Sequence, residues 1–258
     1  MDASGAPPSP LRSALRPGGD HTDKQVWVDW LFSRVAARYD LGNDLMSFGW
    51  HTRWKRRLVE LAAIQPGERV LDLACGTGDV TWMVAPLAAP AEVVGSDINP
   101  DMMALAEPKR PPGVTNVSFV AADATKLPFP DGSFDVVICA YAGRGFPSWD
   151  GVASEVFRVL RPGGRFLNLD FARPPARWWD ATYRGWMIAS GAVLGTVLHG
   201  HPSTYVYIPL SMRSYPGQRW LDERLRAIGF ETRLIETTAC LMAYNLGVRP
   251  SAPPVAGP

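Results

Sequence analysis

A glycine-rich turn beside a carboxylate is the part of this 258-residue chain whose side chains most directly suggest ligand chemistry. Gly76, Thr77 and Gly78 follow an apolar run and precede a helical pattern, so the backbone can pass close to a ligand and helical N–H groups can face it. A dinucleotide-binding turn has a third glycine where this chain has Thr81, and the carboxylate of Asp72 would repel a pyrophosphate. That carboxylate suits a ligand with an ammonium group and no phosphate. The turn therefore favours S-adenosylmethionine (SAM), and a nicotinamide oxidoreductase is the alternative.

Two further aspartates stand at the ends of the next apolar runs. Asp97 lies about twenty residues beyond the turn, where a carboxylate can accept both ribose hydroxyls. Asp123 ends the third run, where it can meet the adenine amino group. Either residue could instead cap a helix or close a turn. Together with the turn, however, they predict one cofactor site at the carboxyl edge of a sheet.

The elements that must position these residues alternate along the chain. Continuous apolar runs suit strands of a parallel sheet that is covered on both faces. Such runs occupy 69–75, 92–98, 117–123, 134–141 and 165–171. Helical spacing marks 26–38, 52–63 and 218–227, and a further helix ends near Leu160 before a turn at 161–164.

Boundary residues support this order of elements. Asn99 can cap a helix whose first residue is Pro100, and Gly229 suits a left-handed helix stop. Two last strands, 231–238 and 240–248, are close enough for an antiparallel pair. We therefore expect an α/β fold: a doubly wound, mainly parallel, Rossmann-like seven-stranded sheet with an antiparallel final hairpin.

The chain is expected to form one domain with helical additions. Residues 1–20 and 249–258 are rich in Pro, Gly and Ser, which predicts disordered tails around a domain spanning 21–248. Helical covers are expected at 21–65 and 172–216. The second cover is long and aromatic, and such an insertion commonly carries function. Its tryptophans either lie in ordinary helices or cover an apolar acceptor at a membrane interface.

Composition narrows the class of protein. A formal net charge of +1 gives no indication of nucleic-acid binding, and the cluster Arg53, Lys55, Arg56 and Arg57 is typical of a solvated helix face. Three widely spaced cysteines fit a reducing cytoplasm and predict neither a disulfide framework nor a metal site. No secretory signal pattern is evident at the start, and the longest apolar stretch, 184–199, is short for a membrane span. We expect a cytoplasmic protein.

Several motifs together resemble the class I SAM-dependent methyltransferases. Besides the glycine turn, these are GSDINPDMM at 95–103, LPFPDGSFDVV at 127–137 and RVLRPGGRFL at 158–167. The segment LFSRVAARYDLGNDLMSFGWHTRWKRRLV at 31–59 closely resembles the C-methyltransferases of menaquinone and ubiquinone biosynthesis. So do Tyr205, Tyr207, Ser211, Met212, Arg213, Pro216 and Gln218 in the second cover.

This resemblance implies particular site residues. The family's cofactor contacts fall on Thr77, Asp97, Asp123, Ala124 and Ala140, although the last position usually carries serine.

The implied acceptor side departs further from the family pattern. Arg144 is kept in the loop after the fourth strand, but Gly145 replaces an asparagine and Leu210 replaces a glutamate. Arg144 is the first candidate to stabilise a phenolate, with a surface ion pair as its alternative role. Tyr39 and His51 are the other catalytic candidates.

The activity that the resemblance implies is C-methylation of a polyprenyl quinol by SAM, without a metal. It also implies a lipid quinol as substrate and peripheral contact with the cytoplasmic face of the membrane. The sequence does not give the oligomeric state, for which a homodimer is one hypothesis. The altered acceptor residues leave two alternatives open. One is a methyltransferase of a soluble phenol or other secondary metabolite, and the other is a SAM-binding scaffold without turnover.

Overall fold

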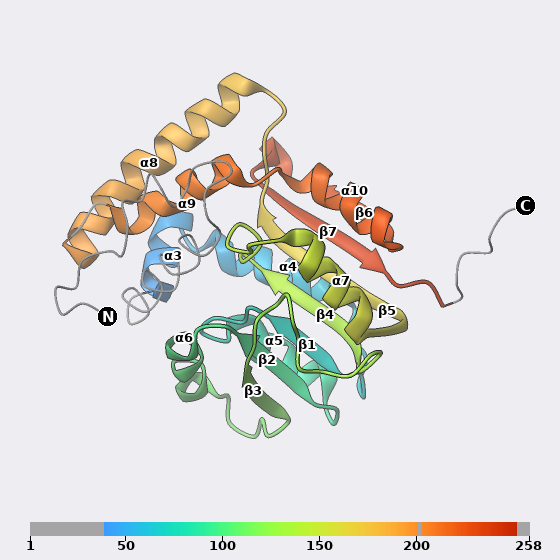
Figure 1. Ribbon diagram of the computed structural model, residues 1–258. Coiled ribbons are helices and arrows are strands. Elements are labelled where there is room, and N and C mark those ends of the chain that lie inside the picture. The colour runs from blue at the N-terminus through green and yellow to red at the C-terminus, as the bar shows by residue number, and fades with distance from the viewer. Residues whose placement is uncertain (1–38, 201–202, 252–258) are drawn as a thin grey trace, which may run out of the picture.

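A seven-stranded mixed sheet forms the centre of the molecule (Figure 1). The computed structural model describes residues 39–200 and 203–251. The strand order is β3-β2-β1-β4-β5-β7-β6, with parallel pairing from β3 to β5 and antiparallel pairing of β7 with both β5 and β6. The expected doubly wound sheet with a terminal antiparallel hairpin is therefore confirmed. The expected tail 1–20 and helix 26–38 lie outside the described residues.

The strands fall close to the expected positions. Their bounds are β1 Val70–Leu73, β2 Val93–Asp97, β3 Val117–Ala121, β4 Phe134–Ala140, β5 Leu160–Phe171, β6 Glu231–Glu236 and β7 Met242–Val248. The exception is β5, which begins before the expected turn at 161–164. Leu160 pairs with Phe134, the register then shifts, and Gly163 takes a φ of 78° that suits its missing Cβ. The turn is thus a distortion within the strand.

Helices cover both faces of the sheet. Their bounds are α3 Tyr39–Ser47, α4 Trp50–Ala62, α5 Asp79–Ala88, α6 Pro100–Ala104, α7 Trp149–Val159, α8 Arg177–His199, α9 Ser203–Ser214 and α10 Gln218–Ile228, with 3-10 turns η2 Glu107–Lys109 and η3 Thr238–Cys240. One apolar cluster packs α4 and α5 on one face of the sheet, and a second packs α7 and α10 on the other. This two-sided burial explains the continuous apolar runs in the strands.

The local boundary predictions hold. Asn99 Oδ1 accepts hydrogen bonds from the backbone N–H groups of Asp101 and Met102, with Pro100 at the first helical position of α6. Gly229 ends α10 with a φ of 117°.

The chain is described through residue 251, past the tail boundary expected at 249. Arg249 belongs to the folded domain because its guanidinium binds the carbonyl groups that end α7.

The helices α3, α8 and α9 lie together beyond one end of the strands (Figure 1). Tyr205 joins them: it is 4% exposed, and a Cβ on Gly42 of α3 or on Gly191 of α8 would collide with it or press closely against it. These two glycines therefore permit the close packing of α9 against both helices. We call α3, α8 and α9 the helical cover.

Candidate functional site

The carboxyl edge of the sheet brings the predicted cofactor residues into one row. Leu73 of β1 pairs with Ser96 of β2 and with Cys139 of β4, while Asp97 pairs with Ala121 of β3. The next residue of each strand or loop therefore emerges at the same level. The turn 74–78, Asp97, the loop that begins at 122 and Ala140 consequently share one edge, where open α/β sheets bind ligands.

The turn after β1 has the backbone conformation that its glycines predict. Gly76 and Gly78 take φ values of 54° and 78°, and Gly78 ends the turn by forming the N-cap of α5. A Cβ on Gly78 would lie 2.7 Å from the Cβ of Ala106, so no larger residue fits there. Thr77 between the two glycines is 3% exposed. The turn thus places backbone and the first N–H groups of α5 at the strand edge.

Asp72 occupies a different position from the one expected of a residue that contacts a ligand directly. Its side chain is 1% exposed and accepts a hydrogen bond of 2.6 Å from Thr81 Oγ1. Burial raises the pKa of Asp72 to about 7, against the opposing effects of Thr81 and Lys55. Thr81, which replaces the third glycine of a dinucleotide turn, is therefore the partner of Asp72 beneath the turn 74–78. We call this turn the cofactor turn, after its predicted role.

The other two aspartates combine turn closure with a position at the edge. Asp97 Oδ2 accepts a 2.8 Å hydrogen bond from the backbone N–H of Gly76, and its Oδ1 accepts one from Asn99, so this half-buried carboxylate ties the cofactor turn to the end of β2. Asp123 is exposed, and its Oδ1 accepts hydrogen bonds from the N–H and hydroxyl of Thr125. Ala124 and Ala140 are half-buried.

A buried lysine on α4 braces the cofactor turn, and its role was not expected from the sequence. Lys55 is 7% exposed, and its Nζ lies 2.7 Å from Asp79 Oδ2 at the start of α5, while Lys109 Nζ lies 3.0 Å from Oδ1. Burial alone would raise the pKa of Asp79, but the two lysines outweigh it and hold that pKa below its ordinary value. The prediction of a solvated basic face on α4 is confirmed for Arg53, Arg56 and Arg57, which are exposed. It is wrong for Lys55, which is buried.

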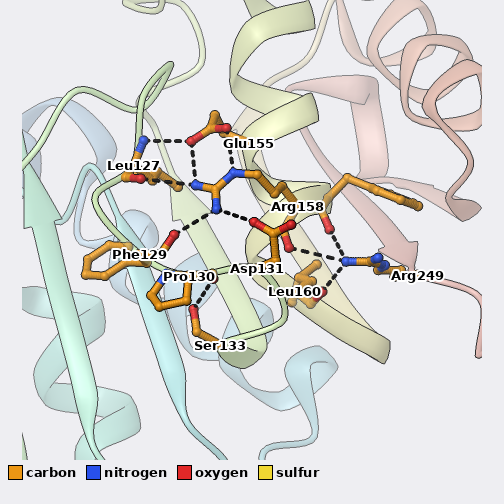
Figure 2. A network of polar contacts seen from close by, with 10 residues as sticks. Leu127, Phe129, Pro130, Asp131, Ser133, Glu155, Arg158, Leu160 and Arg249 are labelled. Atoms are coloured by element: carbon orange, nitrogen blue, oxygen red, sulfur yellow. Dashed lines mark hydrogen bonds and ion pairs between the residues drawn. The ribbon is translucent and has the colours of Figure 1, made fainter.

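A network around Arg158 holds the loop that follows Asp123 (Figure 2). The guanidinium of Arg158 on α7 binds the carbonyl oxygens of Leu127 and Phe129 at 3.0 and 2.7 Å, and it also binds Asp131 and Glu155. Glu155 Oε2 accepts a hydrogen bond of 2.7 Å from the backbone N–H of Leu127. The LPFPDG motif is thus fixed to α7 through both its backbone and its side chains.

Arg144 lies in a buried polar cluster, so its ion pair is not the surface pair that was its alternative. Its Nε donates to Asp170 Oδ1 at 2.8 Å, and the two side chains are 9% and 2% exposed. Longer contacts of 3.4 Å to Ser211 Oγ on α9 and 3.3 Å to the carbonyl oxygen of Tyr141 engage the terminal nitrogens. The guanidinium lies 4.5 Å from the centre of the Phe171 ring.

Asp170 is the residue of this cluster that the sequence prediction missed. A signal existed, because Asp170 is the next-to-last residue of β5, and the other aspartates also lie near the carboxyl ends of their strands: Asp72 within β1, Asp97 at the end of β2 and Asp123 after β3. Tyr215 adds a buried hydroxyl nearby: burial, and secondarily the charge of Asp170, raise the pKa of Tyr215 well above its ordinary value.

The remaining catalytic candidates are placed less favourably. His51 is 8% exposed at the corner between α3 and α4, with its Nδ1 2.9 Å from Ser47 Oγ and 3.7 Å from Asp44 Oδ1. These polar contacts join the end of α3 to the start of α4, and a catalytic role for His51 stays a prediction. Tyr39 begins α3, and its side chain lies outside the described part of the structure. Within residues 39–200 and 203–251, no cluster of three or more His, Cys, Asp or Glu side chains could hold a metal ion.

Comparison with known proteins identifies similar chains over almost the whole length. The sequence profile of the ubiE/COQ5 methyltransferase family matches residues 20–249. A demethylmenaquinone methyltransferase of Thermus thermophilus is 41% identical over 220 residues, which cover 85% of this chain and 100% of that protein. A ubiquinone/menaquinone biosynthesis C-methyltransferase UbiE of Stutzerimonas stutzeri is 39% identical over 233 residues, covering 89% of this chain and 91% of that protein.

Solved structures share the fold at lower sequence identity. A SAM-dependent methyltransferase from Aquifex aeolicus superposes with a TM-score of 0.55 at 15% identity, over 76% of this chain and 89% of that one. This likeness covers the arrangement of sheet and helices described above.

Proposed function

The chain belongs to the ubiE/COQ5 methyltransferase family, and we propose from this premise that it transfers the methyl group of SAM to a ring carbon of a polyprenyl quinol. The observation that carries the proposal is the match to two quinone methyltransferases along the sheet and the helical cover alike. A cofactor domain common to many methyltransferases would match only the sheet.

The residues at the strand edge fit SAM. The glycine turn allows close backbone approach and presents helical N–H groups, and Asp97 is proposed to accept the ribose hydroxyls. Thr81 takes the place of the third glycine of a dinucleotide turn and binds the buried carboxyl of Asp72 beneath the turn. When bound, SAM supplies an electrophilic methyl group. The protein's task is then alignment of donor and acceptor, which can lower a barrier by about 7–11 kcal/mol.

Arg144 is the proposed catalytic residue on the acceptor side. A ring carbon becomes nucleophilic when a neighbouring hydroxyl loses its proton, and a donor to the phenolate oxygen stabilises that state. The guanidinium follows β4 at the carboxyl edge and lies against Ser211 of α9, so it stands between the cofactor edge and the helical cover. It acts there as a hydrogen-bond donor, because an arginine keeps its proton.

The helical cover is proposed to receive the lipid tail and to rest on the membrane surface. Exposed apolar side chains gather on it and on the start of α4: Leu41, Leu45, Phe48, Trp50, Trp178, Trp186, Val193 and Val197. Those on α8 recur at helical spacing along one stripe. Basic residues outnumber the one acid, Asp180, in the segment 172–216, which suits anionic headgroups. No helix of the described residues is long and apolar enough to span a bilayer.

Methylation of an extracted lipid tests this proposal. The purified protein is incubated with SAM labelled in its methyl group and a chemically reduced demethylquinone extract, and the lipid fraction is counted and analysed by mass spectrometry. We expect label in a product heavier by one methyl group. Boiled protein and an unreduced extract are the controls. Absence of label in the lipid fraction would contradict the proposal.

A soluble phenol is the second candidate acceptor. It is favoured by the altered acceptor residues, because Gly145 and Leu210 stand where the resembling quinone enzymes carry polar side chains. Transfer of label to a soluble phenol, with none to the quinol extract, would establish it.

A further inference from the structure

The ion pair of Arg144 with Asp170 determines how the arginine can act on an acceptor. Both side chains are buried, and their charges meet at 2.8 Å between Nε and Oδ1. A buried cation with its counter-ion at this distance presents almost no net charge to a neighbour. The arginine therefore interacts with an acceptor mainly through hydrogen bonds that its N–H groups donate, and it contributes little net charge.

Asp170 is itself rigidly held. Its Oδ1 accepts a second hydrogen bond of 2.8 Å from the backbone N–H of Phe171, whose ring lies beneath the guanidinium. Its Oδ2 faces the loop after β4, because a Cβ built on Gly143 would lie 3.0 Å from this oxygen. The carboxylate is thus fixed between its own strand and the loop that carries Arg144.

The contacts of Arg144 are graded in length. The Nε bond to Asp170 is short, whereas the terminal nitrogens make contacts of 3.4 and 3.3 Å to Ser211 and to the Tyr141 carbonyl. Charge-assisted hydrogen bonds near 2.8 Å are the strong ones. The guanidinium is accordingly anchored at Nε, and its terminal N–H groups are the ones that can turn toward an acceptor oxygen.

We propose that Asp170 is the positioning residue of the reaction: it anchors Arg144 through Nε and neutralises it, so that the terminal N–H groups are directed at the acceptor. This inference rests on the proposed methyl transfer to a phenolic ring. Among the described residues, this pair influences the pKa of Cys139 of β4, Tyr183 of α8 and Tyr215 after α9, and burial keeps the pKa of each above its ordinary value. All three are neutral near pH 7, so none of them adds a charge to the pair of Arg144 with Asp170.

The central experiment is a double-mutant cycle of Asp170→Asn and Arg144→Gln, assayed with labelled SAM and a reduced naphthoquinol. We expect Asp170→Asn to lower kcat by about 10- to 100-fold, as misplacement of a reacting group does, with the dissociation constant for SAM changed less than about threefold. In the Arg144→Gln background the same substitution should change kcat less than about threefold, because residues that act as a unit are not additive.

The pH profile separates positioning from two other roles. In Asp170→Asn the arginine loses the negative charge of its buried partner beside the acceptor, which favours the ionised phenol. The rising limb of kcat against pH should therefore move to lower pH by about one unit. Loss of the rising limb altogether would make Asp170 the proton acceptor and overturn the proposal. An unchanged kcat with lowered thermal stability would also overturn it, because Asp170 would then be purely structural.

Asp222→Asn is the matched control for stability. Asp222 is another buried carboxylate paired with an arginine, Arg226, and it lies on α10. Its substitution should lower stability and leave kcat and the pH profile unchanged. If Asp170→Asn alone does not fold, the proposal is tested by comparing kcat of Arg144→Gln with kcat of the double variant. The double variant is expected to fold because both buried charges have been removed. A further loss of kcat in that double variant would contradict the proposal.

Failure of the proposed function is recognised separately. Wild-type protein that transfers no label to the quinol would overturn the function. Calorimetry of naphthoquinol binding to the protein with S-adenosylhomocysteine then decides the inference without turnover. The expected result is binding weakened at least about tenfold by Asp170→Asn and not weakened further in the Arg144→Gln background. Equal binding by wild type and Asp170→Asn would overturn it.

Discussion

Asp72 shows at the residue scale how a cofactor turn can depend on a buried titratable group. Its carboxyl is 1% exposed and bound to Thr81, and burial raises its pKa to about 7. The residue supports the turn from beneath through its hydrogen bond with Thr81. A carboxyl group in the motif therefore need not be a ligand contact, even where its charge first suggested the ligand.

The first prediction concerns the pH dependence of stability at Asp72. Between about pH 4 and pH 7 the folded state retains a proton that the unfolded chain has lost, so the free energy of unfolding falls as pH rises through this window and is level above it. Asp72→Asn removes this dependence and should be more stable than wild type at pH 8, by about 4 kcal/mol for a rise of about 3 pKa units.

Chemical denaturation at pH 4, 6 and 8 checks this expectation, with the exposed Asp101→Asn on α6 as the control. Asp101→Asn should follow the wild-type curve at each pH. An Asp72→Asn variant that loses stability between pH 4 and 8 as steeply as wild type would show that the group is already ionised in the folded state.

At the scale of elements, side chains from one helix fix the backbone of another segment. Lys55 of α4 reaches the first residue of α5, and Arg158 of α7 holds the loop that follows β3. Lys55 supports a segment at the carboxyl edge of the sheet, whereas Arg158 holds the part of the β3–β4 loop that returns to the start of β4. The helices thus do more than bury the sheet.

The second prediction tests the brace between α4 and α5. Lys55→Met keeps the apolar stem but leaves Asp79 with Lys109 alone, so we expect about tenfold weaker SAM binding and a stability loss of about 1–3 kcal/mol. Calorimetric titration with SAM measures the affinity. Arg56→Met, exposed on the same helix, should leave both quantities within error. Unchanged SAM affinity in Lys55→Met would mean that the turn holds its conformation without the brace.

The third prediction concerns the loop beside the expected adenine position. Arg158→Met removes contacts to the carbonyls of Leu127 and Phe129, so the loop after Asp123 should lose order and SAM affinity should fall by about five- to tenfold (Figure 2). The same titration gives the result, and exposed Arg224→Met on α10 is the control. Hydrogen exchange should rise at residues 124–131 in the Arg158 variant only. Full protection there would contradict the assigned role.

At the scale of the whole molecule, polar chemistry and apolar surface are separated. The cofactor edge collects carboxylates and backbone N–H groups, whereas most of the exposed large apolar side chains lie on the helical cover and at the start of α4. A substrate with a polar ring and an apolar tail would match this division. The acceptor ring would meet Arg144, and its tail would extend along the cover.

The fourth prediction tests the membrane side of this division. Sedimentation with vesicles containing about one-third anionic lipid should recover wild-type protein, and Trp178→Ser with Trp186→Ser should lower the bound fraction by about tenfold. Leu87→Ser, exposed on α5 away from the cover, is the matched control and should bind as wild type does. Equal recovery of the tryptophan variant and wild type would place the lipid contact elsewhere.

The sequence by itself determined the order of the strands, the glycine turn after β1 and the family. These depend on local properties: apolar runs mark strands buried on both faces, Asn99 and Gly229 set helix ends, and glycines allow positive φ at Gly76 and Gly78. Such features act within a few residues, so they can be recognised before the chain is folded.

Only the tertiary structure decided which charges meet. Lys55 and Asp79 are 24 residues apart in the sequence, and Arg144 and Asp170 are 26 apart, so no local spacing predicts either pair. Burial gives each pair its significance, because a charge removed from water must be balanced by the partner that the fold supplies. The sequence identified Arg144 as a candidate. The fold places Asp170 beside it and thereby makes Arg144 a member of a buried ion pair.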